Sequence, residues 1–382
     1  MLAAPELLRL GLNMPFHIFI PPIESDFSIL ISSFRNSLGV GSLGRASRGE
    51  FCSPRRDGNM ATVVWLHGGA CNGNTQSFLN AEEPTVIDLV TDFGIEVLYH
   101  HALVTDMGEQ AKALLNSIIN GERELDVLVV EGTIINGPNG TGRYDMFLGR
   151  PFKDWVADLA PKSFVTVGVG ECASFGGVPS TAPNPSDSEG LQFRKAKRGG
   201  FLGESFVARS GLPVINIPGC PAHPDWISQI LVALATGRVG DIALDEYQRP
   251  QTFFKSFTQT GCTRNQYFEW KQSVEEFGQG TRTGCLFYEK GCRGSFTHSS
   301  CNRILWNRQS SKTRAGQPCH GCTEPNWPHY DLAPGTVFKT QKVLGVVPRD
   351  VPEGTDPLSY TLHAAAARAA APEWAKDDMF VV

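Results

Sequence analysis

The sequence has no run of the roughly 18–20 apolar residues that a membrane-spanning helix needs, and its 382 residues carry a net charge of only −5. This weak charge gives no basis for binding nucleic acid or an anionic membrane. Arg55 and Arg56 are followed by Asp57 and not by an apolar segment, so we expect no twin-arginine export signal. We therefore expect a cytoplasmic protein without a transmembrane segment, with peripheral attachment to the cytoplasmic face of a membrane as the alternative.

Both ends of the sequence differ from its middle. Residues 1–59 show no clean apolar period and are rich in Ser and Gly towards their end, which predicts a disordered N-terminal extension. An arm that packs on a partner is the alternative for this segment. The C-terminal tail, 351–382, contains the alanine-rich run 364–371, which predicts a helix docked on the surface or on a partner.

Between residues 60 and 245 short apolar runs alternate with amphipathic segments. Helical spacing of apolar residues occurs within 108–121 and again within 227–234. This alternation predicts an α/β domain with a doubly wound parallel sheet. The predicted strands are 62–66, 95–99, 127–130, 164–167 and 213–217.

From 246 to 350 the strand-like runs stop, and Cys, Gly, Arg and Asn become frequent. A segment with so little regular apolar pattern cannot build a core of its own. Small cysteine-rich units of this kind usually depend on disulfides or metals. We predict an irregular second domain held together by inorganic groups.

The ten cysteines are the outstanding feature of the composition. Disulfides need an oxidising compartment, so in a cytoplasmic protein these residues point towards metal binding. Cys71, Cys172 and Cys220 each follow a predicted strand, and the carboxyl ends of parallel strands share one edge where ligands bind. Three buried core cysteines are the alternative. Cys52 lies in the N-terminal extension, and we expect it to be uninvolved.

Six further cysteines lie in the second half of the chain. Only one pair has the Cys-x-x-Cys spacing that zinc and iron–sulfur sites both use, at Cys319 and Cys322. A zinc site usually has two such short spacings, whereas here the other ligands come singly. The pattern favours iron–sulfur clusters and leaves zinc as the alternative. The remaining four are Cys262, Cys285, Cys292 and Cys301.

A series of motifs surrounds these cysteines. In order they are Trp65-Leu66 ahead of Cys71, Glu131-Gly132-Thr133, Cys172-Ala173-Ser174-Phe175-Gly176-Gly177, Pro218-Gly219-Cys220-Pro221, Gly284-Cys285, Gly291-Cys292-Arg293-Gly294, and Pro318-Cys319 with Gly321-Cys322-Thr323-Glu324-Pro325. With this series the sequence resembles the small subunit of nickel–iron hydrogenases over roughly 61–350, and most closely the cytosolic-facing uptake class of cyanobacteria and actinobacteria. The resemblance implies a flavodoxin-like domain at 60–245 and a cluster-binding domain at 246–350.

The resemblance also implies which cysteines act together. The proximal trio is Cys71, Cys172 and Cys220; the medial trio is Cys301, Cys319 and Cys322; the distal trio is Cys262, Cys285 and Cys292. Each trio would bind iron in one cluster, and the chain would relay electrons from hydrogen oxidation in a large subunit, through three clusters, to an acceptor of unknown identity. Higher oligomers of the heterodimer are expected.

Two positions depart from the family pattern. Asn74 stands where the proximal Cys-x-x-Cys motif has its second cysteine, and Gln259 stands where the distal site has a histidine. An amide oxygen is a poor ligand for cluster iron. We therefore expect three [3Fe–4S] clusters, with [4Fe–4S] at the proximal and distal sites if these amides ligate a fourth iron. Three [3Fe–4S] clusters would have higher reduction potentials than the usual mixture, because cluster type helps to set the potential. Higher potentials would favour hydrogen uptake over hydrogen evolution.

No catalytic residue is expected in this chain beyond a role for Glu131, which ends the third predicted strand. Glu131 would position the proximal cluster or pass protons, and an exposed or helix-capping carboxylate is the alternative. Three other functions stay open. They are a hydrogen-sensing subunit that signals to a partner, a flavoprotein on the same fold, and a zinc-stabilised interaction protein.

Overall fold

The computed structural model describes residues 61–270, 272–274 and 284–328. The predicted extension 1–59 and the tail 351–382 lie outside the described residues, as does 329–350 of the predicted second domain. The division into domains near residue 245 stays a prediction. No helix in the described ranges has the length and apolar content to cross a bilayer.

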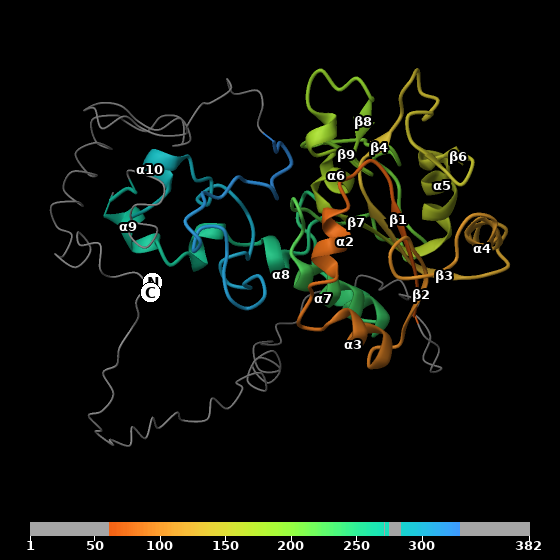
Figure 1. Cartoon of the computed structure of the whole chain (residues 1–382), viewed down its shortest axis with the longest axis horizontal. Coiled ribbons are helices and arrows are strands. Elements are labelled where there is room, and N and C mark those ends of the chain that lie inside the picture. The colour runs from red at the N-terminus through yellow and green to blue at the C-terminus, as the bar shows by residue number, and fades with distance from the viewer. Residues whose placement is uncertain (1–60, 271, 275–283, 329–382) are drawn as a thin grey trace, which may run out of the picture. The chain divides into compact units, whose positions relative to one another are not determined.

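A five-stranded parallel sheet forms the centre of the first half of the chain (Figure 1). The strand order β2-β1-β3-β7-β11 corresponds to 2-1-3-4-5 along the sequence, which is the flavodoxin-like order. The predicted fold class is therefore confirmed. The strands are β1 (Ala61–His67), β2 (Ile95–His100), β3 (Leu125–Glu131), β7 (Ser163–Val169) and β11 (Ile215–Ile217).

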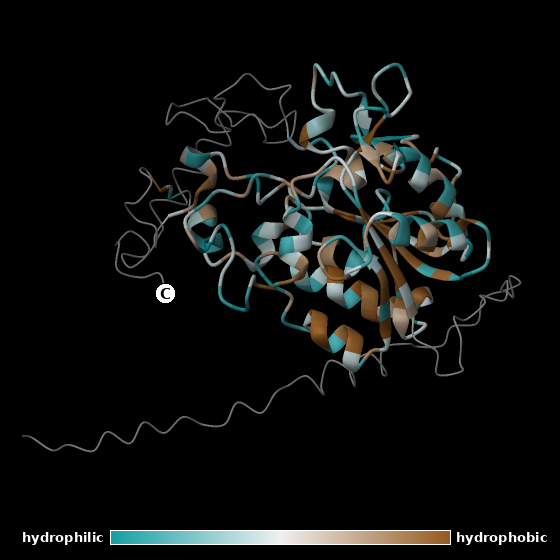
Figure 2. Cartoon of the chain, turned by 45° about the vertical axis from the view of Figure 1, so that its right-hand side comes forward, coloured by the Kyte–Doolittle hydropathy of each residue, from teal (hydrophilic) through white to brown (hydrophobic). Residues whose placement is uncertain are grey.

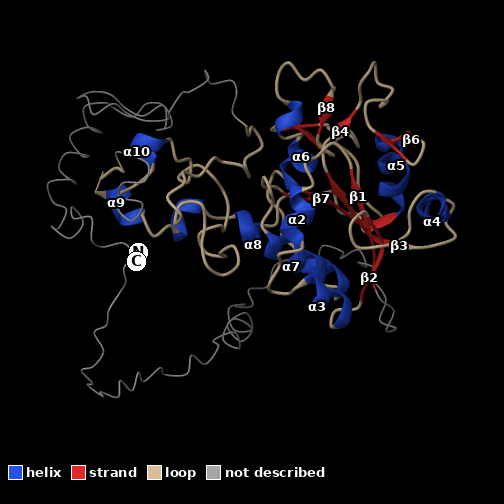
Figure 3. Cartoon of the chain, viewed as in Figure 1, coloured by secondary structure: helices blue, strands red, loops and turns tan. Residues whose placement is uncertain are grey.

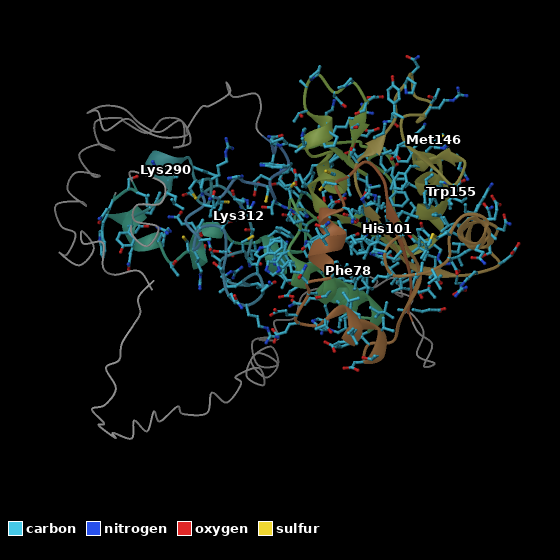
Figure 4. The ribbon with its side chains drawn as sticks, in the orientation of Figure 1. Phe78, His101, Met146, Trp155, Lys290 and Lys312 are labelled. Atoms are coloured by element: carbon cyan, nitrogen blue, oxygen red, sulfur yellow. The ribbon has the colours of Figure 1, made fainter. Side chains whose placement is uncertain are left out.

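Both faces of the sheet are apolar because neighbouring side chains on a strand point to opposite faces. Val63 and Trp65 belong to one buried cluster, whereas Val64 and Leu66 belong to another. Phe78 packs in the first cluster and Trp155 in the second, and both are labelled in Figure 4. The strands are accordingly among the most hydrophobic segments of the chain (Figure 2).

Helices cover the two faces. Side chains of α2 (Gly73–Phe78), α3 (Val86–Thr91) and α7 (Pro224–Ala235) pack in the first cluster. Those of α4 (Glu109–Ile119) and α5 (Phe152–Leu159) pack in the second. The remaining elements before residue 245 are short: α6 (Gly170–Phe175), β4 (Ile134–Ile135), β5 (Met146–Phe147), β6 (Arg150–Pro151), β8 (Ser188–Glu189), β9 (Phe193–Arg194) and β10 (Lys197–Arg198).

Beyond residue 245 the described chain consists mainly of turns and loops (Figure 3). Its α-helices are α8 (Gln251–Phe254), α9 (Asn265–Glu269) and α10 (Phe287–Lys290), none longer than five residues. A small apolar cluster in this part includes three cysteines, Cys285, Cys292 and Cys319. The apolar packing here therefore depends in part on sulfur-bearing side chains.

His100 makes the stability of the sheet edge depend on pH. Its side chain is 1% exposed, and its Nδ1 accepts a hydrogen bond from the amide N–H of Ala102 at 3.0 Å, which requires the neutral ring. Burial, with smaller contributions from His101 and His67, lowers the pKa of His100 to about 4. In the unfolded chain His100 takes up a proton at a higher pH than in the folded protein. The contribution of the neutral ring to the free energy of unfolding is therefore fully present above pH ~6.5 and is lost as the pH falls towards 4.

We expect the free energy of unfolding to fall between pH 7 and pH 5 by less in His100→Gln than in the unchanged protein. The full linkage amounts to about 3 kcal/mol. Hydrogen exchange of the β1 and β2 amides at the two pH values measures the difference. Glu109→Gln, which removes an exposed titratable side chain on α4, is the control. Equal pH dependence in the unchanged protein and in His100→Gln would contradict the assignment.

Candidate cluster-binding sites

The proximal trio gathers at the carboxyl edge of the sheet, as predicted from the strand ends. Cys71 follows β1, Cys172 lies in α6 directly after β7, and Cys220 follows β11. Burial and the nearby thiols of Cys220 and Cys71 raise the pKa of Cys172 to about 12. Three free thiols therefore lie within electrostatic reach of one another at this edge.

Glycines leave space beside these sulfur atoms. A Cβ added to Gly177 would lie 2.7 Å from the Cys172 Sγ, and one added to Gly73 would lie 3.1 Å from the Cys71 Sγ. Gly177 also has a φ of +55°, a conformation that residues with a side chain rarely adopt. The backbone can therefore approach a bulky inorganic group at this position.

Glu131 anchors the loop that carries Cys71. It is fully buried, and its carboxylate accepts hydrogen bonds from the Trp65 Nε1 at 3.0 Å and the Asn74 amide N–H at 3.0 Å. Thr75 donates twice more, from its amide at 3.1 Å and its hydroxyl at 2.5 Å. The carboxylate is therefore not exposed and caps the start of α2, as the helix-capping alternative has it. Roles in positioning a cluster and in proton transfer stay predictions.

Asn74 lies at the predicted fourth corner, but its amide is already engaged. The Oδ1 accepts a hydrogen bond from the Ala222 amide at 2.9 Å. Its side chain also lies against the backbone at Gly170, where an added Cβ would come within 2.3 Å of the Asn74 Nδ2. Asn74 therefore joins α2 to the segments that carry Cys172 and Cys220.

Glu171, beside Cys172, is a buried residue of the proximal site that the sequence analysis does not predict. It is 1% exposed, and neither carboxylate oxygen has a hydrogen-bond partner among the described residues. Burial raises the pKa of Glu171 well above its usual range, and the Cys322 thiol adds to the shift. An acidic residue in the first turn of a helix is usually a favourable surface charge, so no local signal indicates this burial.

The medial trio lines a pocket together with Cys220 of the proximal trio. Burial and the nearby Cys322 thiol raise the pKa of Cys301 to about 12, and the same two causes raise the pKa of Cys319. Lys312, labelled in Figure 4, also lines this pocket. The three thiols predicted to act together are therefore neighbours.

The distal trio lines a second pocket, with Gln259 on its wall. The Gln259 Nε2 donates to the Asn265 Oδ1 at 2.8 Å. Backbone amides point at the sulfur atoms: the Arg264 N–H donates to the Cys262 Sγ at 3.4 Å, and the Phe287 N–H donates to the Cys285 Sγ at 3.4 Å. Hydrogen bonds of this kind tune the potential of a bound cluster.

Arg264 lies buried beside the distal trio. Its Nε donates to the Thr313 carbonyl at 2.8 Å and its Nη1 to the Gly284 carbonyl at 3.0 Å, so the side chain ties together three loops. Burial lowers the pKa of Arg264, while the nearby Cys262 and Cys285 act in the opposite direction. A cation is thus held close to the thiols that a cluster would use.

The three trios are linked in the order proximal, medial, distal. Cys220 and Cys322 are electrostatic neighbours, because the Cys322 thiol contributes to the raised pKa of Cys220, after burial. The Cys319 amide donates a hydrogen bond to the Cys292 Sγ at 3.2 Å. Sulfur-bearing residues therefore form a continuous series from the sheet edge to the distal pocket.

The donor set fits iron–sulfur clusters. All nine cysteines are free of disulfides, and the thiols lie close together with glycine-made space beside two of them. No three Cys, His, Asp or Glu side chains in the described residues are placed to hold a single metal ion. In a cluster each thiolate binds a different iron atom, so ligands are spaced more widely than around one ion.

Family models and curated relatives match most of the described chain. Residues 71–234 match the family of the NADH ubiquinone oxidoreductase 20 kDa subunit, and residues 254–333 match the C-terminal family of the NiFe/NiFeSe hydrogenase small subunit. The F420 non-reducing hydrogenase II small subunit of Methanosarcina mazei is 35% identical, covering 70% of this chain and 73% of the relative. The periplasmic [NiFe] hydrogenase small subunit of Solidesulfovibrio fructosivorans is 31% identical, covering 70% and 78%.

Solved structures show the same fold. The actinobacterial-type NiFe-hydrogenase from Ralstonia eutropha H16 matches with a TM-score of 0.64 and 26% identity, covering 85% of this chain and 95% of that chain. The reduced Ni-Fe-Se hydrogenase from Desulfomicrobium baculatum matches with a TM-score of 0.63 and 28% identity, covering 74% and 100%. The chain belongs to the family of nickel–iron hydrogenase small subunits.

Proposed function

We propose that this chain is the electron-transfer small subunit of an uptake hydrogenase, paired with a large subunit that carries the nickel–iron centre. The observation that carries the proposal is the linked series of three cysteine trios described above. Iron–sulfur clusters bound there would accept and release single electrons, so that electrons from hydrogen reach an external acceptor. The protein's residues fix the spacing and surroundings of the three sites.

The cysteines are assigned to the clusters by trio. The proximal trio takes the site nearest the large subunit, the medial trio the middle site, and the distal trio the exit. The Asn74 Oδ1, the atom that would bind iron, already accepts a hydrogen bond, whereas the hydrogen bond of Gln259 uses its Nε2 and not its oxygen. The engaged oxygen of Asn74 supports a three-iron core at the proximal site, and the medial site, with three cysteines even in the family pattern, is the plainest case.

Likeness to an actinobacterial-type enzyme supports the uptake class that faces the cytosol. We propose a cytoplasmic or peripherally membrane-attached heterodimer that assembles into higher oligomers. A hydrogen-sensing subunit is the alternative within the family, and it differs in turning over slowly and in binding a signalling partner.

Co-expression with the large subunit and measurement of hydrogen-dependent dye reduction tests the function. We expect a brown heterodimer that reduces an artificial acceptor in multiple turnovers. Replacing Cys319 by Ser, in the medial trio, should abolish dye reduction while the large subunit still exchanges hydrogen with deuterium oxide. A brown heterodimer that carries its clusters but reduces no dye would contradict the uptake function and favour the sensing alternative.

Arg264 provides a test of the distal site. Replacing it by Gln should lower the reduction potential of the distal centre, because a buried cation stabilises the more negative, reduced core. The expected shift is on the order of 50–100 mV, since one electron and ~59 mV correspond to ~1.4 kcal/mol. A redox titration followed by electron paramagnetic resonance measures it.

Two variants control the Arg264 experiment. Arg264→Lys retains the charge and should keep most of the potential, whereas Arg303→Gln removes an exposed cation in the same half of the chain. The assignment fails if Arg264→Gln and Arg303→Gln shift the distal potential equally.

A further inference from the structure

Two buried polar side chains, Asn302 and Thr313, lie between the medial and distal sites. Each is 3% exposed, and each lines both the pocket of the medial trio and the pocket of the distal trio. Asn302 directly follows Cys301 of the medial trio. The Thr313 Oγ1 lies 3.5 Å from the Sγ of Cys262 in the distal trio. The two side chains therefore form a polar wall that the medial and distal sites share.

Hydrogen bonds hold this wall in place. The Asn302 Nδ2 donates to the Thr258 carbonyl at 2.8 Å. The Asn302 Oδ1 accepts from the Thr313 hydroxyl at 2.8 Å and also from the Ser311 hydroxyl. The Thr313 carbonyl accepts from the Arg264 Nε at 2.8 Å. Thr313 is thus fixed through both its backbone and its side chain, with its hydroxyl beside a distal sulfur atom.

The contact between Thr313 and Cys262 depends on which of the two groups has a hydrogen to donate. In the structure the Cys262 thiol donates to the Thr313 Oγ1. A cysteine binds iron as the thiolate, which has no hydrogen. With a cluster bound, the Thr313 oxygen would therefore face an anionic sulfur, unless the hydroxyl pointed its own hydrogen at that sulfur.

The Thr313 hydroxyl can make this change by rotating about its Cβ–Oγ1 bond. The Asn302 Oδ1 keeps the hydrogen bond from Ser311 after the rotation, so no buried acceptor is left without a donor. Hydrogen bonds to an ionised acceptor are roughly twice as strong as those between neutral groups. The hydroxyl hydrogen therefore goes to the thiolate rather than to the amide oxygen.

We propose that Thr313 is a positioning residue of the electron relay, whose hydroxyl donates a hydrogen bond to the Cys262 thiolate and raises the reduction potential of the distal cluster. A donor to ligand sulfur stabilises the reduced core more, because that core is the more negative one. Transfer from the medial to the distal site moves one electron and breaks no covalent bond, so a higher distal potential favours it. The inference rests on the proposed function and deepens it.

A redox titration of the purified heterodimer, followed by electron paramagnetic resonance, tests the proposal. Thr313→Val removes the hydroxyl and keeps the shape of the side chain. We expect the equilibrium constant for reduction of the distal centre to fall about three- to tenfold, as for the loss of one hydrogen bond. For one electron this is a lowering of the potential by ~30–60 mV. Thr313→Ser keeps a hydroxyl and should retain most of the potential.

Thr166→Val is the matched control. Thr166 is a buried threonine of β7, and its hydroxyl is hydrogen-bonded to the Ser163 hydroxyl at 2.9 Å and not to sulfur. This variant should leave the distal potential unchanged. An unchanged distal potential in Thr313→Val, or an equal shift in Thr313→Val and Thr313→Ser, would overturn the proposal.

Ser311→Ala tests the same hydrogen bond with Thr313 in place, and it decides the question if Thr313→Val does not retain its clusters. The Asn302 Oδ1 then loses one of its two hydroxyl donors and competes with Cys262 for the Thr313 hydrogen. We expect the distal potential to fall, by less than in Thr313→Val, and an unchanged potential in Ser311→Ala would overturn the proposal. Absence of a distal centre from the unchanged heterodimer would instead count against the proposed function.

Discussion

Removing iron and sulfide is expected to unfold the described chain beyond residue 254 while the parallel sheet stays folded. That part has α-helices of at most five residues, and its apolar cluster includes three cysteines. Where a metal site organises a small irregular unit, its binding free energy becomes folding free energy, on the order of 10 kcal/mol for structural zinc. We expect a stabilisation of similar order from the medial and distal clusters.

Hydrogen exchange with mass spectrometry measures this directly. After treatment with an iron chelator and an oxidant, amides in 254–328 should exchange at nearly unprotected rates, whereas β1, β3 and β7 should remain protected. The same treatment with the chelator already saturated with iron is the control. Retained protection in 254–328 after complete loss of iron would show that the clusters do not hold this part together.

Replacing Glu131 by Ala is expected to cause a large loss of stability in the sheet region. It removes the acceptor of four hydrogen bonds and leaves their donors, from Trp65, Asn74 and Thr75, buried without a partner. Unsatisfied buried donors cost ~1–3 kcal/mol each and are only partly rescued by relaxation, so we expect about 3–5 kcal/mol in total. Exchange of the β1 and β3 amides reports this free energy.

The same substitution should weaken the proximal site. Without the carboxylate, α2 loses the group that caps its first turn, and the loop bearing Cys71 loses its anchor. We therefore expect reduced iron at the proximal site by Mössbauer spectroscopy. Glu131→Gln keeps one acceptor oxygen and should lose less stability and less proximal iron than Glu131→Ala. Glu122→Ala, at an exposed carboxylate, should lose neither stability nor iron. Unchanged protection of the β1 and β3 amides from hydrogen exchange in Glu131→Ala would contradict the anchoring role.

The sheet could be predicted from the sequence because each of its strands is a short apolar run. Each of the five predicted apolar runs overlaps an observed strand, and the predicted helix at 108–121 is α4. The short helix α2 could not be predicted. Its residues, Gly73–Phe78, have no apolar period, and it begins where the Glu131 carboxylate, 57 residues away in sequence, receives its first amides.

The sequence predicts which cysteines gather at the candidate sites, but not how the neighbouring side chains Glu171 and Asn74 are placed. Cys71, Cys172 and Cys220 follow strands, and parallel strands bring such positions to one edge. The burial of Glu171 depends on how the second half of the chain covers α6, since Cys322 is among its neighbours. Likewise nothing local shows that the Asn74 amide is held by Ala222, 148 residues away.

Chemical analysis can establish whether the three trios bind iron–sulfur clusters at all. The quantity to measure is the iron and acid-labile sulfide content of the anaerobically purified heterodimer, after subtraction of the iron in the large subunit. The linked trios predict about 9 to 12 iron atoms with a similar amount of sulfide in this chain, and parallel loss of both when one cysteine of each trio is replaced. A preparation with neither iron nor sulfide, or with zinc in their place, would contradict cluster binding.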